Sequence, residues 1–431
     1  MVPSSTERKS PNMNSEEDDS RSTLHCNLIP VMLCIWNSLI SIHKFAGKHF
    51  NLPTAKRAST NPNIIMESLP SLPFDLVTEI LSRLPVKMLV RFRCVCKPWN
   101  SLISDHDFSR KHFKLSTTRN LYFTSYSGRS RRFVLKSYPL QSVFTDLTTS
   151  FTRLEFPFNC PYSYGHNLHY IVGSCDGILC LAYIRTSFVV LWNPSIRKFK
   201  ELPLFENPED LPAIRLVVKY GFGYDHVSRN YKVVVLYNCG IHEGTTKIKV
   251  YTLSTNSWRN IGTLPFPFVY RHFDTLPFPF VYRHLDDACG IYVSGSINWL
   301  AYTKWHHPFC IVSFDLGTES CQRICPPGGL EMQWLRLCVL KDCLCVVSRD
   351  DVWVMKEYGV KESWTKLFEL SNSLVQFVPF YILTNELYIF EDDKVWLEEK
   401  WKKKLIKNDT FKVTAKTLPQ ICTESLISPC S

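Results

Sequence analysis

Residue types that could carry out chemistry occur along the 431-residue chain without forming a catalytic pattern. There is no glycine-rich phosphate loop, no H-E-x-x-H and no G-x-S-x-G nucleophile turn. Gly221 and Gly223 have the spacing of a phosphate-binding turn, but no helical pattern follows them, so we expect a turn that leads into a strand. His306 and His307, beside Trp305, are more typical of a solvated or core-edge pair than of a metal site.

The seventeen cysteines are spread along the chain, and the densest group lacks the paired C-x-x-C arrangement of a zinc site. That group consists of Cys321, Cys325, Cys338, Cys343 and Cys345. Several cysteines alternate with apolar residues, as small buried side chains do, and none is placed as a thioester-forming nucleophile. We therefore expect a reducing compartment, the cytoplasm, the nucleus or both, with no catalytic residue, metal or cofactor.

Composition and charge indicate a soluble, multidomain chain. Its hydrophobic content of 45% and charged content of 21% are ordinary for globular proteins, and its length allows two or more domains. The net charge of +11 is partly local, with basic residues at 129–132 and 400–407. These runs lack the motif of a nucleic-acid reader, so we expect no nucleic-acid binding and favour attraction to an acidic protein partner.

The elements that would position a functional surface begin with a helical stretch at residues 72–113. Its first apolar stripe has helical spacing and consists of Leu76, Val77, Ile80, Leu81 and Leu84. Pro85 ends this helix and starts the next, and Pro98 suits the first turn of a third. Ser104 or Asp105 can cap a fourth. So few residues cannot bury all their large apolar side chains among themselves, and the surplus must face either the rest of this chain or another protein.

This stretch resembles the F-box, the module by which substrate receptors dock onto the Skp-type adaptor of cullin ubiquitin ligases. The matching residues, in order, are Leu72-Pro73, Ile80-Leu81, Leu84-Pro85, Lys87, Leu89, Arg91, Val95, Cys96, Lys97, Trp99, Leu102-Ile103, Asp105, Phe108 and His112. The resemblance implies a set of residues that supplies the adaptor-binding surface and the core of the module, without dividing one from the other. That set is Leu72, Pro73, Leu76, Ile80, Leu81, Leu84, Pro85, Leu89, Val95, Cys96 and Trp99.

The composition of residues 1–65, which precede the module, predicts a disordered or poorly structured extension. The run at 28–42 is apolar, but it is too short and too interrupted for a confident membrane span, and it lacks the basic start of a signal peptide. Met66 stands directly before the module, so we interpret residues 1–65 as an extension that some forms lack. A membrane-tethering interfacial helix is the alternative, and we expect no stable membrane insertion.

From about residue 120 the pattern changes to short strands rich in Val, Ile, Tyr, Phe and Trp. Candidate strands lie at 121–126, 178–184, 188–192, 232–237, 247–253, 290–293, 297–302, 309–314, 338–347, 351–354 and 386–390. Trp192, Tyr251, Phe314 and Trp353 recur about forty to sixty residues apart, near the period of propeller blades.

These strands resemble the F-box-associated, kelch-like domain of plant F-box proteins. The motifs that carry the resemblance are GSCDGILC at 173–180, WNPS at 192–195, GFGYD at 221–225, NYKV at 230–233, VY at 250–251 and NSW at 256–258. The resemblance implies a β-propeller over residues 120–395, with a blade number that the missing paired glycines leave open. Some kelch propellers are oxidases, so a copper enzyme stays the catalytic alternative.

Two further segments depart from the blade pattern. Residues 263–274 recur as 275–286 and differ only at Phe273 and Leu285, so we expect one copy to form a surface loop, with a binding loop as the alternative. Residues 396–431 predict a partly disordered C-terminal segment, with a closing strand near 411–413 and disorder beyond Pro419.

The sequence therefore predicts an α+β multidomain protein, with an all-α F-box module at 66–114 followed by an all-β kelch-like propeller. Such a chain would be a non-catalytic substrate-recognition subunit of a Skp-cullin-F-box ubiquitin ligase. Its partners would be a Skp-type adaptor, the cullin reached through that adaptor, and an unknown target protein. A propeller that acts as a ligase-independent binding or scaffold protein is the alternative.

Overall fold

The described part of the chain falls into two compact units. The computed structural model describes residues 73–127, 132–145, 151–156, 169–183, 187–206, 217–238, 246–264, 289–302, 309–330, 335–348, 351–369, 378–383, 386–391, 394–399, 402–407 and 419–430. Within these residues, one unit holds 73–81 and 89–103, and the other holds 82–88 and everything from 104 onward. The predictions for residues 1–65, for the strand near 411–413 and for nearly all of the duplicated segment lie outside the described residues.

Four short helices form where the apolar spacing and the prolines predict them. They are α2 (Phe74–Ser82), α3 (Val86–Phe92), α4 (Lys97–Ser104) and α5 (His106–Leu115). Pro85 separates α2 from α3 because its ring cannot continue a helix. Asp105 is the residue that caps α5, since its carboxylate accepts a hydrogen bond from the Phe108 backbone N–H at 2.8 Å.

The rest of the described chain forms six antiparallel sheets of four strands each, and together these sheets confirm the predicted β-propeller. The first sheet contains β1 (Arg119–Ser127), β2 (Arg132–Pro139), β3 (Thr152–Leu154) and β24 (Gln420–Thr423). The second contains β4 (His169–Cys175), β5 (Ile178–Tyr183), β6 (Val189–Asn193) and β7 (Lys198–Glu201). The third contains β8 (Val217–Asp225), β9 (Asn230–Asn238), β10 (Lys247–Thr252) and β11 (Ser257–Thr263).

The remaining three sheets repeat this arrangement. The fourth contains β12 (Ile291–Val293), β13 (Ser296–Tyr302), β14 (Phe309–Asp315) and β15 (Cys321–Ile324). The fifth contains β16 (Arg336–Leu340), β17 (Cys343–Val347), β18 (Asp351–Met355) and β19 (Trp364–Glu369), with the short helix η5 (Lys361–Ser363) before β19. The sixth contains β20 (Val378–Leu383), β21 (Glu386–Glu391), β22 (Lys394–Glu399) and β23 (Lys402–Lys407). A further helix that the sequence did not predict, α6 (Leu140–Thr145), follows β2.

Tight turns divide one segment that the sequence predicted as a single strand. Residues 338–347 fall in two strands, β16 and β17, which pair with each other in register. Lys341 and Asp342 lie between them with φ values of +50° and +59°. Two consecutive positive φ angles are typical of the turns whose twist matches a two-residue hairpin. The single-strand prediction was wrong because no glycine marks this turn.

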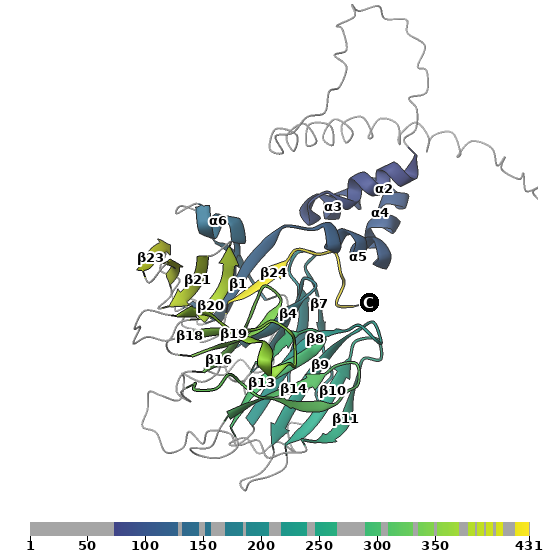
Figure 1. The fold of residues 1–431 in the computed structure, drawn as a ribbon. Coiled ribbons are helices and arrows are strands. Elements are labelled where there is room, and N and C mark those ends of the chain that lie inside the picture. The colour runs from purple at the N-terminus through teal and green to yellow at the C-terminus, as the bar shows by residue number, and fades with distance from the viewer. Residues whose placement is uncertain are drawn as a thin grey trace, which may run out of the picture. The chain divides into compact units, whose positions relative to one another are not determined.

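The two ends of the β domain meet in the first sheet. Successive sheets contact one another through β4, β8, β12, β16 and β20, the first strand of each. In the first sheet the equivalent position belongs to β24, which pairs with β1 and contacts β4 (Figure 1). The prediction of disorder beyond Pro419 was therefore wrong, and the propeller extends past the predicted boundary at 395. A short polar strand such as β24 acquires its order from its partner strand.

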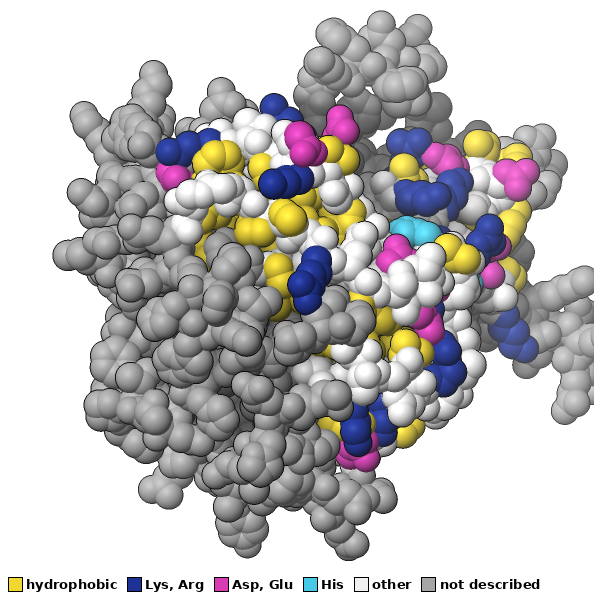
Figure 2. Space-filling view, turned by 60° about the horizontal axis from the view of Figure 1, so that its bottom comes forward, with side chains coloured by type: hydrophobic (Ala, Val, Ile, Leu, Met, Phe, Trp, Pro, Cys, Tyr) yellow, Lys and Arg dark blue, Asp and Glu magenta, His cyan; other side chains and the backbone are white. Residues whose placement is uncertain are grey.

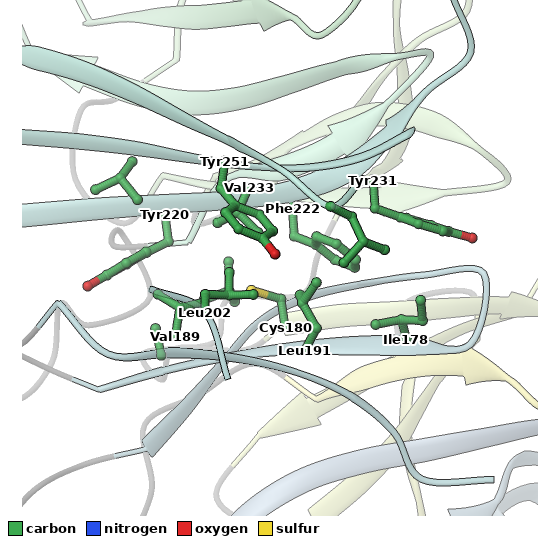
Figure 3. Close-up of a cluster of buried hydrophobic side chains, with 14 of the residues drawn as sticks. Ile178, Cys180, Val189, Leu191, Leu202, Tyr220, Phe222, Tyr231, Val233 and Tyr251 are labelled. Atoms are coloured by element: carbon green, nitrogen blue, oxygen red, sulfur yellow. The ribbon is translucent and has the colours of Figure 1, made fainter. Parts of the chain in front are cut away.

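A large hydrophobic cluster of the described residues lies between the second and third sheets. Figure 3 shows Tyr220, Phe222 and Tyr251 of the third sheet facing Cys180 and Leu191 of the second. All five side chains are at most 1% exposed. Burying a side chain of this size contributes about 1.5–3 kcal/mol, so this cluster is a main reason that adjacent sheets stay together.

Gly221 and Gly223 lie inside strand β8, and not in the turn that the sequence predicted. A Cβ atom added at Gly221 would collide with the side chain of Ile297, and one at Gly223 would collide with the ring of Tyr292. Both of these side chains belong to the fourth sheet. The two glycines are therefore required by close packing between neighbouring sheets, and this accounts for the spacing without any phosphate.

Candidate functional site

Helix α2 presents large apolar side chains to solvent. Phe74, the first residue of α2, is 51% exposed, and Leu76, the third, is 53% exposed. The Thr78 hydroxyl donates to the Phe74 carbonyl at 3.0 Å, which keeps this first turn closed. Exposed large apolar side chains that lie two residues apart are a typical anchor for a protein partner.

The core of the same unit lies beneath this helix turn. Leu81, Leu89 and Ile103 are at most 1% exposed. The Phe92 and Trp99 rings pack with their centroids 5.6 Å apart. The ring contact joins α3 to α4, and the burial of Leu81 shows that the later part of α2 is covered as well.

The structure divides the eleven predicted adaptor-binding residues by exposure. Pro73, Leu76 and Pro85 are exposed; Ile80, Val95, Cys96 and Trp99 are half-buried; Leu81, Leu84 and Leu89 are buried; Leu72 lies outside the described residues. Their role in binding an adaptor stays a prediction, but the buried members can serve only the module's own packing in this state. Sequence reasoning missed Phe74, which the apolar run after Pro73 could have indicated.

A buried histidine ties α5 to the turn between α2 and α3. The Nε2–H group of His112 donates to the carbonyl oxygen of Leu84 at 2.8 Å. Burial lowers the pKa of His112, against smaller opposite effects of this hydrogen bond and of Glu424. The ring is therefore neutral near pH 7 with its proton on Nε2, and it acts as a fixed structural donor.

The residues of the GSCDGILC and WNPS motifs bind the C-terminal segment. A Cβ at Gly177 would collide with the Ser425 side chain. The buried Asn193 amide donates to the backbone oxygens of Ser425 and Ile427, at 3.0 and 2.8 Å. Gly177 and Asn193 therefore contact the segment after β24, and this contact gives both motifs a structural role.

The GFGYD and NYKV motifs lie on β8 and β9, which pair with each other within the third sheet. The Lys232 ammonium lies 2.8 Å from Asp225 and 2.8 Å from Glu319, and Arg259 lies 2.6 Å from Glu319. Burial raises the pKa values of Asp225 and Glu319. Hydrogen bonds from Lys232 and neighbouring donors lower these pKa values by a larger amount, so the net shifts are downward. This network joins the third sheet to the fourth. The motifs that identify the domain are thus explained by its assembly.

Reactive groups are not gathered in the described part of the chain. No three His, Cys, Asp or Glu side chains come together there as a metal site. Burial raises the pKa of Cys321 to about 11, and burial with the nearby Asp176 raises that of Cys422 to about 12, so both remain thiols at neutral pH. His306 and His307 lie outside the described residues.

Charge on the visible surface is mixed. Figure 2 shows basic and acidic side chains interspersed with hydrophobic ones across the coloured face, without a broad area of one sign. None of the described helices is long and apolar enough to cross a membrane.

A short helical module followed by a β-propeller defines the class of this protein, and comparisons with known sequences give the family. A family model described as "F-box domain" matches residues 69–111, and one described as "F-box associated beta propeller domain" matches residues 131–418. The chain belongs to the family of F-box proteins that carry this propeller domain. The propeller match leaves out β1 and β24, the two strands that join the ends of the domain.

Similar proteins come from the plant Arabidopsis thaliana. The F-box/kelch-repeat protein At3g23880 is 31% identical over 335 residues, which cover 74% of this chain and 85% of that protein. The F-box protein At3g07870 is 29% identical over 349 residues, which cover 71% and 74%. The F-box protein CPR1 is 31% identical over 330 residues, which cover 69% and 72%.

Proposed function

We propose that this chain is the substrate-recognition subunit of a Skp-cullin-F-box ubiquitin ligase in the cytoplasm, the nucleus or both. The helical module docks onto a Skp-type adaptor, and through it onto the cullin, while the propeller holds a target protein. The chain breaks and forms no bonds itself. Holding a target lysine near a charged ubiquitin-conjugating enzyme makes the transfer effectively intramolecular, which is a large kinetic advantage.

The observation that carries this proposal is the exposed apolar pair on α2, in a region that matches the F-box family. Truncating an apolar anchor at the centre of an interface commonly costs about 2 kcal/mol or more, about 30-fold in affinity. We therefore expect the double change Phe74→Ala and Leu76→Ala to weaken adaptor binding by at least this factor. Leu204→Ala, at a 43% exposed leucine of the propeller, is the matched control and should leave binding unchanged.

Trp99 and Leu84 also belong to the set that the F-box resemblance implies, but they suit such a test less well. Leu84 is 3% exposed, so Leu84→Ala would remove core packing and reduce binding through unfolding. Trp99 is half-buried against Phe92 and has the same problem to a lesser degree. The Phe74 and Leu76 pair separates binding from folding. Full adaptor binding by the well-folded double variant would refute the proposal.

The target is to be found with the whole chain. Affinity purification with the proteasome blocked should enrich a target that disappears when the propeller is absent. The full chain with Phe74→Ala and Leu76→Ala should keep the target but lose the adaptor and the cullin. If targets are held and no adaptor is recovered with either chain, the protein is a ligase-independent binding protein.

A further inference from the structure

Helix α5 contacts the propeller through Phe113, which packs against the cluster between the second and third sheets, and through Arg110, which makes three contacts. The Arg110 guanidinium donates to the Asp176 carboxylate, with Nη1 and Oδ2 2.5 Å apart. The same guanidinium lies over the Tyr224 ring at 4.3 Å from its centroid and near the Tyr231 ring at 5.3 Å. The Tyr231 hydroxyl also donates to the same Asp176 oxygen at 2.8 Å, so this carboxylate holds both Arg110 and Tyr231.

These four groups come from three separate parts of the fold. Arg110 is on α5, Asp176 is in the β4–β5 turn of the second sheet, and Tyr224 and Tyr231 are on β8 and β9 of the third. Burial, with the Asp176 charge next, raises the pKa of Tyr231, so its O–H group stays available as a donor to Asp176. Arg110 and Asp176 are each about one-fifth exposed, which shields their attraction from water and salt.

Helix α5 belongs to the F-box module by sequence but to the propeller unit by its contacts. The F-box family match runs over residues 69–111 and so includes Arg110. In space, however, residues from 104 onward form one compact unit with the propeller, and residues 82–88 belong to the same unit. The His112 hydrogen bond to Leu84 lies within this unit as well. The boundary of the sequence module and the boundary of the folded body therefore differ, because α5 and residues 82–88 belong to the propeller unit.

We infer that Arg110 is a positioning residue, which fixes α5 to the propeller so that the last helix of the F-box moves together with the target-binding domain. This inference rests on the proposed ligase function for its consequence, although not for its geometry. The chain between adaptor and target passes through α5. Its attachment therefore limits which lysines can reach the charged ubiquitin-conjugating enzyme.

The first test measures hydrogen exchange of the α5 amides in the full chain. Arg110→Ala and the nearly isosteric Asp176→Asn should each speed exchange over residues 107–115 by about tenfold or more, with strands β4 and β8 unchanged. Arg110→Lys keeps the charge without the flat stacking surface and should fall between wild type and Arg110→Ala. Lys114→Ala, at an exposed site on the same helix, should change nothing. Unchanged exchange in both Arg110→Ala and Asp176→Asn would overturn the inference.

The second test measures ubiquitin transfer in the reconstituted ligase, mapped on the receptor's own lysines by mass spectrometry. Arg110→Ala should spread modification over more lysines at unchanged adaptor affinity, and Arg110→Lys should restore much of the wild-type distribution. A proportional decrease at every lysine would indicate a folding defect and would contradict a positioning role. Failure of the wild-type chain to bind adaptor would instead refute the proposed function, and the exchange measurement would still decide the attachment.

Discussion

Two glycines in equivalent hairpins differ only in what surrounds them. Gly177 has a φ of +86° and Gly295 a φ of +79°, and each follows a residue whose φ is also positive. A Cβ at Gly177 would meet the Ser425 side chain and lie 2.9 Å from the Thr423 carbonyl oxygen, whereas nothing lies within 4 Å of one at Gly295. The pair therefore separates the cost of backbone strain from the cost of crowding the C-terminal segment.

Changing each glycine to alanine should measure these two costs. Gly295→Ala should lower the free energy of unfolding by about 1 kcal/mol, the cost of a left-handed backbone for an L-residue. Gly177→Ala adds overpacking against backbone and should lose about 2–4 kcal/mol in total. Urea unfolding followed by far-UV circular dichroism gives both values. Equal losses would mean that the C-terminal segment does not press on this turn in solution.

His112 should make stability depend on pH. Burial lowers its pKa in the folded chain, so below the unfolded-state value of about 6.5 the unfolded chain binds a proton that the folded chain does not. Stability is therefore fully present above that pH and falls as the pH drops through it, by at most about 1.4 kcal/mol per pH unit.

His112→Gln keeps a side-chain donor for the Leu84 carbonyl and removes the titrating group. Unfolding free energies of this variant between pH 7.5 and pH 5.5 should lack the part of the decrease that His112 causes in the wild type. If both proteins show the same pH dependence, other groups control it and His112 is not the source.

Residue types could predict the helical module but not its division into core and surface. The apolar residues from Leu76 to Leu84 recur at helical spacing throughout. This spacing shows which face of the helix is apolar, but not which of its turns another element covers. Leu81 and Leu84 are buried while Leu76 is 53% exposed, although all three lie on the same predicted stripe. The motif residues Asp176 and Asn193 were recognised by resemblance, and only the structure gives their partners.

At the scale of elements, β24 should be the strand on which the propeller's closure depends. It pairs with β1, and the segment that follows buries Leu426 and Ile427. A chain that ends at residue 418 loses this pairing, this burial and the partners of Asn193. We expect its melting temperature to fall by about 10 °C or more, measured by differential scanning calorimetry.

A synthetic peptide of residues 419–430 provides the control for that truncation. Because the missing strand is a separate piece of sheet, the peptide should bind the shortened chain and restore most of the melting temperature. A peptide with the same composition in scrambled order should not. Truncation without any loss of stability would show that β1 tolerates an open edge.

The sequence could predict the strands that are rich in apolar residues, but not the polar strands at the outer edges of the sheets. Strands such as β6 and β9 were found because Val, Leu and Tyr run through them. The outer strands β7 and β15, with sequences KFKE and CQRI, carry little apolar signal. The count of four strands per sheet, and with it the number of sheets, therefore had to come from the structure.

At the scale of the whole molecule, the two compact units should fail independently. Phe74→Ala with Leu76→Ala changes exposed side chains of the helical unit, and Gly177→Ala changes a turn of the propeller unit. We expect the first variant to lose adaptor affinity at an unchanged melting temperature, and the second to lose melting temperature at unchanged adaptor affinity. Calorimetry and adaptor titration on the same preparations measure both properties. Coupled losses in either variant would show that the units fold as one.

The pairing of β1 with β24 joins groups 304 residues apart in the chain, as the 3.0 Å hydrogen bond from Asn120 to Glu424 illustrates. During synthesis, β1 therefore leaves the ribosome long before β24 has been made. Until then the N–H and C=O groups on this edge of β1 stay unpaired and exposed to solvent. Any nascent chain halted by an early stop codon keeps that edge exposed permanently. Such products should be bound by chaperones and removed, and only a chain translated through β24 can escape this surveillance.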